Sequence, residues 1–286
     1  MKLPATLLAL TLSMGVAFGA TSAPASEDRT IDLNGVLNTR DLGGLQTEDG
    51  RKVRTGQIIR SGEIDDIDAA GLDTLDTLGV STVIDLRTTL ETTNPAEWPE
   101  GEGPDRYNFY LMEDDAQAIE DMRAAIKSGT ATAENTEALF YDAFADVPLE
   151  YTEELRGVFD VLLAQPDDET VLLHCSGGKD RTGITTALVL SALGVTREDI
   201  EADFLMSNVQ KQADKKAVEI ANKVNEANGT NMSAAAVWPS LGIRADHLTT
   251  FYDSVSESYG SVDGYLRDGI GLTDEDIEKL RDRYLE

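Results

Sequence analysis

The residues best suited to chemistry lie in one short segment, residues 171–183. This segment reads Val-Leu-Leu-His-Cys-Ser-Gly-Gly-Lys-Asp-Arg-Thr-Gly, and its Cys175 is the single cysteine of the 286-residue chain. The apolar run before the cysteine predicts a buried strand over Thr170–Leu173, and the residues after the loop predict a helix over Gly183–Leu193. A thiol on a glycine-bearing loop, followed by an arginine where a helix begins, is suited to attack on phosphate esters.

This loop offers several groups that stabilise negative charge. A cysteine attacks as its thiolate, which forms more readily beside a helix N-terminus or a cation. Gly177 and Gly178 allow the backbone to curl with its amides toward an anion, and the guanidinium of Arg181 can hold two phosphate oxygens. We therefore expect one cradle to stabilise both a resting thiolate and a phosphoryl group in the transition state.

The remaining polar residues of the loop receive supporting roles. We expect the Thr182 hydroxyl to donate a hydrogen bond to the thiolate and to help it leave from a phospho-enzyme. We expect His174 to orient the loop, and we place His174, Ser176 and Lys179 with the two glycines among the substrate-binding residues. Lys179 either contacts an additional phosphate or offsets the charge of Asp180.

Three other interpretations of this segment fit less well. A lone cysteine after a strand is often only a small core residue, but the flanking polar residues and glycines argue against that reading here. A nucleotide-binding loop would need Ser or Thr after its lysine, whereas Lys179 is followed by Asp180. A zinc site would need more ligands than one cysteine and two histidines, His174 and His247. We therefore expect neither a metal nor a cofactor.

The composition limits the classes of partner. The chain has 53 acidic and 24 basic residues and a net charge of −29, so nucleic-acid binding is disfavoured because the phosphate backbone would be repelled. The hydrophobic content of 41% suffices for a sizeable core. Asp65, Asp66 and Asp68 do not follow the spacing of a calcium-binding loop. The acidic residues are therefore expected to form a solvated surface.

The first 25 residues have the pattern of a secretory signal peptide. Lys2 precedes a short apolar run, small residues follow, and Ala23-Pro24-Ala25 offers a cleavage site, with an earlier cut at Gly19 or Ala20 as the alternative. The apolar run is too short to predict a stable membrane anchor. We therefore expect an extracytoplasmic protein, periplasmic or secreted, whose residues 26–286 form one catalytic domain. Its lone cysteine can form no disulfide within the chain.

The segments around the loop alternate between strand and helix, which predicts an α/β domain with a mainly parallel sheet flanked by helices. A polar loop over Leu37–Gly44 precedes the first strand. Strands are predicted over Ile58–Ser61, Val80–Leu86, Tyr107–Leu111 and Thr170–Leu173, with a helix over Ile67–Leu78 that ends at Gly79. Further helices are predicted over Ala118–Ile126, Thr136–Phe144, Tyr151–Ala164, Ile200–Asn208, Lys211–Asn225, His247–Tyr259 and Asp274–Leu285, with breaks at Gly129 and Pro148.

The pattern His174-Cys175-x5-Arg181-Thr182 resembles the signature of the protein-tyrosine phosphatase superfamily. The longer string through Lys179, Asp180 and Gly183 resembles bacterial tyrosine phosphatases that also act on phosphoinositides. Further similarity lies in the motifs Asn38-x-Arg40-Asp41-Leu42-Gly43-Gly44, Arg60-Ser61-Gly62, Val83-Ile84-Asp85-Leu86-Arg87 with Glu91, Tyr259-Gly260-Ser261, Tyr265-Leu266-Arg267 and Gly271-Leu272-Thr273. The resemblance therefore covers nearly all of the chain after the expected signal peptide.

The resemblance implies catalysis in two displacements without a metal. Cys175 would attack phosphorus, and water would hydrolyse the resulting cysteinyl-phosphate while the loop amides and Arg181 hold its charge. The leaving oxygen needs a general acid, and in the resembled bacterial group that acid stands where this chain has Asp180. Asp114 or Asp115 is the alternative acid, since a mobile acid loop could lie there. Asp180 would then be only a hydrogen-bond acceptor that stabilises the loop.

The resemblance also bears on the substrate and the pocket. It implies phosphotyrosine substrates, with phosphoserine, phosphothreonine and phosphoinositides as further candidates, and an additional phosphate contact at Lys179. Arg87, and Arg40 with Asp41, would line the pocket, and Asp85 would brace an arginine. Helices within residues 116–165 and 200–240 would cover the site as a lid. A catalytically silent phosphate-binding module and a sulfur-transfer enzyme remain as alternative functions, and the oligomeric state stays open.

Overall fold

A five-stranded sheet organises the computed structural model, which describes residues 29–92 and 103–286. The strand order is β1-β2-β5-β3-β4, with β1 antiparallel to β2 and every other pair parallel. The predicted mainly parallel sheet is therefore confirmed. The strands are β1 (Arg40–Asp41), β2 (Ile58–Ser61), β3 (Val80–Asp85), β4 (Asp105–Asn108) and β5 (Thr170–His174).

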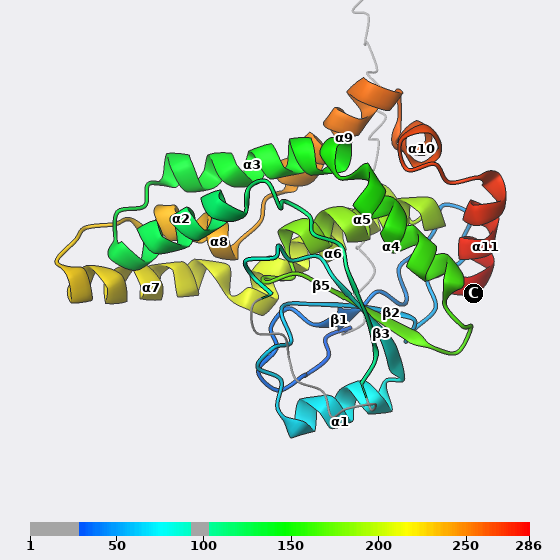
Figure 1. Cartoon of the computed structure of the whole chain (residues 1–286), viewed down its shortest axis with the longest axis horizontal. Helices are drawn as coiled ribbons and strands as arrows, with labels where there is room; N and C mark the ends of the chain where they lie inside the picture. Colours follow the sequence, from blue (N-terminus) through cyan, green and yellow to red (C-terminus); the bar gives the residue numbers. More distant parts are fainter. Residues whose placement is uncertain (1–28, 93–102) are drawn as a thin grey trace, which may run out of the picture.

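Helices cover both faces of this sheet, as Figure 1 shows for the short α1 on one face and α4 and α5 on the other. The described helices are α1 (Ala69–Thr77), α2 (Ala116–Ser128), α3 (Ala133–Glu150), α4 (Thr152–Ala164), α5 (Asp180–Leu193), α6 (Arg197–Lys211), α7 (Ala213–Asn228), α8 (Ala234–Leu241), α9 (Ala245–Tyr259), α10 (Val262–Gly264) and α11 (Asp274–Tyr284), with a π-helical turn over Tyr265–Gly269. The sequence pattern predicts most of these helices but misses α8, the short α10 and the π-helical turn.

The side chains of β5 show why the central strand needs both layers. Leu172 packs into the smaller core beside α1, whereas Val171 and Leu173 point into the main core. Successive side chains of a strand alternate between the two faces of a sheet, so a strand covered on both faces must be apolar throughout. The main core continues through helices α3, α4, α5, α9 and α11.

Three predicted boundaries were wrong. Helix α5 begins at Asp180 rather than Gly183, because an acidic residue is favoured in the first turn of a helix. Strand β4 lies over Asp105–Asn108, since backbone pairing with β3 at the sheet edge accommodates its exposed polar side chains. Helix α3 continues through Pro148, which lies near the helix end and removes a single hydrogen-bond donor. The expected polar loop 37–44 also contains β1.

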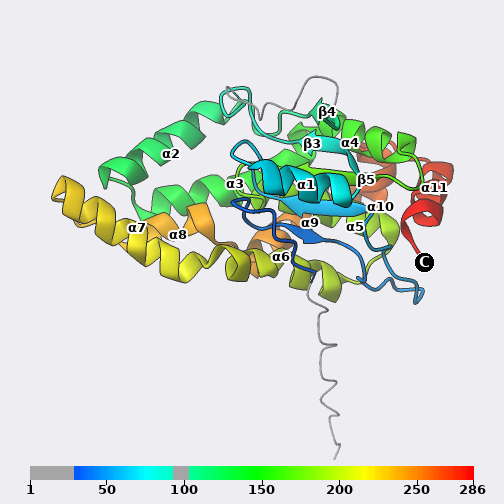
Figure 2. The same cartoon turned by 90° about the horizontal axis from the view of Figure 1, so that it is seen from below.

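Helices α2, α3, α7 and α8 form an arm that extends from one end of the sheet, as Figures 1 and 2 show. Helix α8 packs between α3 and α7, and α2 lies against α7. A separate small core, formed by Ala217, Ala221, Met232, Ala236 and Val237, joins α7 to α8. The arm stands beside the carboxyl end of β5, where the cysteine loop begins.

The predicted signal peptide, residues 1–25, lies outside the residues that the structure describes. Within the described ranges, no helix combines the length and the apolar character that a membrane span requires.

Candidate active site

The loop between β5 and α5 is held by its carbonyl groups. The Glu63 amide donates to the Ser176 carbonyl at 3.1 Å, and the Lys211 ammonium donates to the Gly177 carbonyl at 3.2 Å. The Gly178 carbonyl accepts from the Asn38 side-chain amide at 2.7 Å and from Arg60 at 3.0 Å. Each of these donors comes from outside the loop.

The backbone amides of the same loop are left available. In the described part of the chain, no protein group accepts a hydrogen bond from the amides of residues 176–181. Amides at the start of a helix, turned toward one point, form a binding site for an anion. Because Cys175 stands at the beginning of this loop, its thiol lies where such an anion would be bound.

Gly178 is required for this curl. Its φ of 62° lies in the left-handed region, and a Cβ at this position would overlap the backbone carbonyl of Ser61. The loop therefore approaches the end of β2 more closely than any residue with a side chain would permit.

Arg181 is positioned by a carboxylate from another segment. Its guanidinium forms two hydrogen bonds with Glu91, Nη1 to Oε2 at 2.5 Å and Nη2 to Oε1 at 3.0 Å. Glu91 also accepts from the Ser176 hydroxyl at 2.5 Å and from the Thr88 amide at 3.0 Å. Burial raises the pKa of Glu91, but its hydrogen bonds from Arg181 and Ser176 outweigh burial and hold that pKa far below its usual value.

A buried cluster of charges lies behind the loop. Asp203 on α6 accepts hydrogen bonds from Arg29 at 2.8 Å, from Arg40 at 2.9 Å and from Arg60 at 2.7 Å. Burial raises the pKa of Asp203, yet the three arginines hold it far below its usual value. Burial and the neighbouring Arg40 lower the pKa of Arg60 to about 9. One carboxylate therefore balances three guanidinium groups, and one of these, Arg60, also donates to the Gly178 carbonyl of the loop.

Lys211 adds another cation behind the loop. Its side chain is buried, and in the described part of the chain no carboxylate lies within ion-pair distance of its ammonium. Burial, with a smaller effect of Lys179, lowers the pKa of Lys211 to about 8. This cation is therefore poised to lose its charge in mildly alkaline solution.

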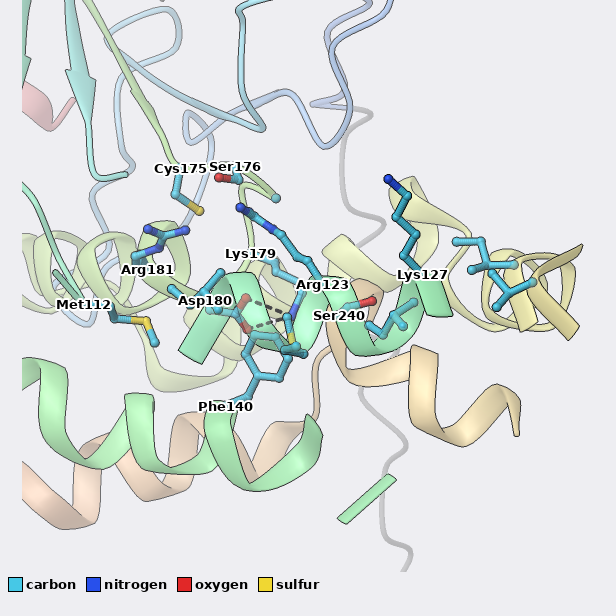
Figure 3. Close-up of a pocket in the computed structure, with 16 residues that line it drawn as sticks. Met112, Arg123, Lys127, Phe140, Cys175, Ser176, Lys179, Asp180, Arg181 and Ser240 are labelled. Atoms are coloured by element: carbon cyan, nitrogen blue, oxygen red, sulfur yellow. Dashed lines mark hydrogen bonds and ion pairs between the residues drawn. The ribbon is translucent and has the colours of Figure 1, made fainter. Parts of the chain in front are cut away.

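Lys179 and Asp180 form a buried pair. The Lys179 ammonium lies 2.8 Å from the Asp180 carboxylate and 2.7 Å from the Pro239 carbonyl of α8, and it lies 4.0 Å from the centre of the Phe140 ring. Figure 3 shows the two side chains pointing toward one another among the residues that line the pocket. The Lys179 ammonium is therefore already bound by other groups of the protein. Burial lowers the pKa of Lys179.

The loop opens into a cavity of about 420 Å³, shown in Figure 3. Of the residues with predicted site roles, Cys175, Ser176, Gly177, Lys179, Asp180 and Arg181 line this cavity. Its other walls come from Met112 and from side chains of the arm formed by α2, α3, α7 and α8. These side chains are Ile119, Met122, Arg123, Ile126, Lys127, Phe140, Ile220, Val224 and Ser240. Helices α4 and α6, which fell within the predicted lid ranges, supply no lining residue.

Several predicted site residues lie behind the cavity. The Arg87 guanidinium pairs with Asp85 at 2.8 Å and with Asp65 at 2.5 Å, so Asp85 does brace an arginine, but neither of the two lines the cavity. Arg40 and Asp41 do not line it either, because Arg40 pairs with Asp203 and Asp41 accepts from the Gly43 and Gly56 amides. The buried His174 lies 3.7 Å from Asp85 and 3.4 Å from the Cys175 carbonyl. Burial lowers the pKa of His174, which favours a neutral ring. The Thr182 hydroxyl is buried without a hydrogen-bond partner among the described residues.

The two alternative acids stand apart from the loop. Neither Asp114 nor Asp115 lines the cavity. Burial and the neighbouring Asp146 raise the pKa of Asp115, and the Asp114 amide instead contacts the Tyr151 hydroxyl at 3.1 Å. In the described part of the chain, Asp180 is the carboxylate that lines the cavity.

Sequence reasoning gave no role to four residues that shape the site: Asn38, Glu91, Asp203 and Lys211. Asn38 and Glu91 belong to motifs that carried the family resemblance, so a signal for them existed. Asp203 and Lys211 lie on α6 in an ordinary polar pattern, and nothing in their sequence context separates them from surface residues.

Comparison with known proteins gives a consistent result. The model of the tyrosine phosphatase family matches residues 31–286. A Cupriavidus necator protein named as a tyrosine-protein phosphatase is 32% identical over 268 residues, which cover 93% of this chain and 91% of the relative. The triple specificity protein phosphatase PtpB of Mycobacterium tuberculosis is 30% identical over 282 residues, covering 87% of this chain and 97% of the relative. A tyrosine-protein phosphatase of Nostoc commune is 24% identical and covers 96% of each chain.

The lowered pKa of Lys211 predicts pH-dependent anion binding. Below about pH 8 the ammonium is charged, and above it the charge is lost, so replacing Lys211 with Met should weaken sulfate binding about tenfold near pH 7 and much less near pH 10. Calorimetric titration with sulfate, whose own charge is constant over this range, measures the affinity ratio of the two proteins.

Lys211→Arg is the matched control, since arginine keeps its charge across the whole range. It should bind sulfate at least as well as the unchanged protein above about pH 8. An affinity ratio between the unchanged protein and Lys211→Met that is the same at all pH values would contradict a titrating role for this ammonium.

Proposed function

This chain belongs to the tyrosine phosphatase family and is a protein-tyrosine phosphatase, and we propose that it works through a cysteinyl-phosphate on Cys175. The observation that carries the proposal is the loop itself, in which carbonyls are bound from outside while the amides of residues 176–181 stay available beside the thiol. Such a loop can hold the three non-reacting oxygens of a phosphate monoester. A protein that binds phosphate without catalysis would not need a nucleophile, an arginine and a carboxylate that all line the same cavity.

The first step transfers the phosphoryl group to the enzyme. The Cys175 thiolate attacks phosphorus, the S–P bond forms, and the P–O bond to the leaving group breaks with its electron pair going to that oxygen. Arg181, held in place by Glu91, and the loop amides stabilise the charge that develops on the equatorial oxygens. Asp180 gives a proton to the leaving oxygen, so that a neutral phenol departs.

The second step returns the enzyme to its starting state. Water attacks the phosphorus, a P–O bond forms as the S–P bond breaks, and Asp180, now ionised, accepts a proton from the water. The Thr182 hydroxyl, which has no protein partner among the described residues, is available to donate to the departing thiolate. Lys179 positions Asp180, since its ammonium binds that carboxylate and the Pro239 carbonyl at once.

We propose phosphotyrosine as the main substrate. The residues next to the loop, Met112 and Phe140, give the cavity apolar walls that suit an aromatic ring. The name of the mycobacterial relative, a triple specificity phosphatase, supports including phosphoserine, phosphothreonine and phosphoinositides as further substrates. The helices of the arm, α2, α3, α7 and α8, would then act as the lid over a bound substrate.

We also propose that the enzyme acts outside the cytoplasm. The support is the charged, apolar and small-residue pattern of residues 1–25. An exported enzyme meets oxidising conditions, and its single cysteine cannot be consumed by a disulfide within the chain.

Replacing Cys175 with Ser should abolish turnover of 4-nitrophenyl phosphate in the absence of added metal. A serine hydroxyl at this position is a far weaker nucleophile than a thiolate, so a loss of at least about a thousandfold in kcat is expected. Steady-state release of 4-nitrophenol measures it, and unimpaired sulfate binding by the variant serves as the folding control. Activity that survives the substitution would rule out the thiol as nucleophile.

Replacing Asp180 with Ala should affect substrates according to their leaving groups. A good leaving group such as 4-nitrophenol departs without protonation, whereas phenol does not, so kcat/KM should fall about tenfold or less for 4-nitrophenyl phosphate and about a hundredfold or more for phenyl phosphate. Parallel assays of the two esters measure the difference. Asp115→Ala is the matched control, and equal losses on both esters in Asp180→Ala would place the general acid elsewhere.

Export predicts a shortened N-terminus. Secreted or periplasmic material should begin between about residue 20 and residue 26, according to the cleavage-site pattern. Intact-mass measurement of the protein recovered from the culture or the periplasm reports the start of the chain. A mature protein that still begins at Met1 would refute the signal-peptide assignment.

A further inference from the structure

The cavity has a charge opposite to that of the molecule. The whole chain carries a net charge of −29. Among the side chains that line the cavity, four are cationic, Arg123, Lys127, Lys179 and Arg181, and one is a carboxylate, Asp180. A cluster of cations in so acidic a protein indicates a function beyond solubility.

Three of these four cations have carboxylate partners, and two of the three, Arg181 and Lys179, are committed to the loop. Arg181 is paired with Glu91 and faces the loop where the scissile phosphate would bind. Of the two roles open to Lys179, a contact to an additional phosphate and an offset of Asp180, the structure shows the second, since its ammonium binds Asp180, the Pro239 carbonyl and the Phe140 ring. A second anionic group on a substrate must therefore be met by other side chains.

Arg123 reaches the edge of the loop from α2. Its Nη2 lies 2.7 Å from Glu91 Oε1, the same oxygen that accepts from Arg181 and from Ser176. Its side chain is 41% exposed, and its other contact is with Glu120, one turn back on the same helix. Arg123 therefore stands directly beside the phosphate cradle with part of its guanidinium open to the cavity.

Lys127 lies one helical turn beyond Arg123. Residues four apart on a helix share one face, and Figure 3 shows Arg123 extending toward Ser176 while Lys127 lies farther from the loop. Lys127 is exposed, and in the described part of the chain its ammonium has neither a hydrogen-bond acceptor nor a carboxylate partner. Its charge is therefore available to a ligand that extends out of the cradle along α2.

Most of the other side chains that line the cavity are apolar. They are Met112, Ile119, Met122, Ile126 and Phe140, with Ile220 and Val224 of α7. An inositol ring would have to bury its hydroxyl groups against these side chains without hydrogen bonds, which is costly. An aromatic ring loses little on entering the same space.

We infer that Arg123 and Lys127 form a second anion-binding subsite, and that the preferred substrate is a phosphotyrosine peptide with a carboxylate side chain next to the phosphotyrosine. This inference rests on the proposed phosphatase activity. The phosphate binds in the loop, the ring contacts the apolar walls, and the neighbouring carboxylate binds the cations of α2. The subsite sets specificity by favouring acidic sequences that the rest of this acidic protein repels.

Two phosphotyrosine peptides that differ only in having Glu or Gln on both sides of the phosphotyrosine test the inference. The ratio of kcat/KM for the Glu peptide to that for the Gln peptide should be about two- to fivefold in the unchanged enzyme, the range expected for a partly exposed ion pair. The ratio should fall to about one in Lys127→Met and be retained in Lys127→Arg. Raising the salt concentration should lower it.

Lys215→Met is the matched control, since it removes the same charge from α7 at an exposed position outside the cavity. It should leave the ratio unchanged. Equal kcat/KM for the two peptides, or a ratio that Lys127→Met does not lower, would overturn the subsite.

Two further substrate assays separate the other outcomes. Phosphatidylinositol bisphosphate in phosphatidylcholine vesicles should be a poorer substrate than the Glu peptide. If it is the better one and Lys127→Met reduces its turnover, the subsite binds an inositol phosphate and the peptide assignment is wrong. If 4-nitrophenyl phosphate is not hydrolysed at all, the proposed function fails, whereas normal turnover of this ester with equal peptide rates refutes the subsite alone.

Discussion

The whole site depends on the way in which the carbonyl groups of the cysteine loop are bound from behind. A free loop could turn either its carbonyls or its amides toward the thiol, and only the second arrangement binds an anion. Asn38, Arg60 and Lys211 fix that choice, because each donates to a loop carbonyl from a different segment of the chain. Gly178 permits the curl that these contacts require. The phosphate chemistry therefore depends on residues that need not touch the substrate.

The charge around the cysteine loop is positive, whereas the net charge of the whole chain is negative. Asp203 binds three arginines yet cancels only one of their charges. Lys211, which has no carboxylate partner within the described ranges, adds to the excess. Removing the carboxylate of a buried ion pair typically costs about 3–5 kcal/mol, because unpaired cations are left without water. Asp203 is thus needed for the stability of the fold, while the positive charge that it leaves uncancelled serves the loop. Buried charge is kept near the thiol, and the acidic residues lie mostly at the surface.

The sequence was most informative where local pattern determines structure. The apolar runs predicted β2, β3 and β5, and the spacing of Cys175 and Arg181 predicted the loop between β5 and α5. Contacts between distant segments could not be predicted in this way. The sequence left Lys179 either to contact an additional phosphate or to offset Asp180, and in the structure its ammonium binds Asp180 and also a carbonyl on α8, a helix that the sequence pattern missed. Arg87 was expected in the pocket, but Asp65 and Asp85 hold it behind the loop. In both cases one partner is a near neighbour in the sequence, but a second one from a distant segment, Pro239 for Lys179 and Asp65 for Arg87, helps to fix where the cation points and is invisible to local pattern.

The most direct test of the mechanism is to find the phosphate on the enzyme. Protein mixed with an excess of phosphotyrosine peptide and denatured rapidly in acid during turnover can be digested and mapped by mass spectrometry. The structure predicts a phosphate on the peptide that contains Cys175, since the loop amides and Arg181 surround that sulfur. Phosphate attached to another residue, or continued turnover without any phosphorylated form of the protein under conditions that preserve phosphocysteine, would contradict the account.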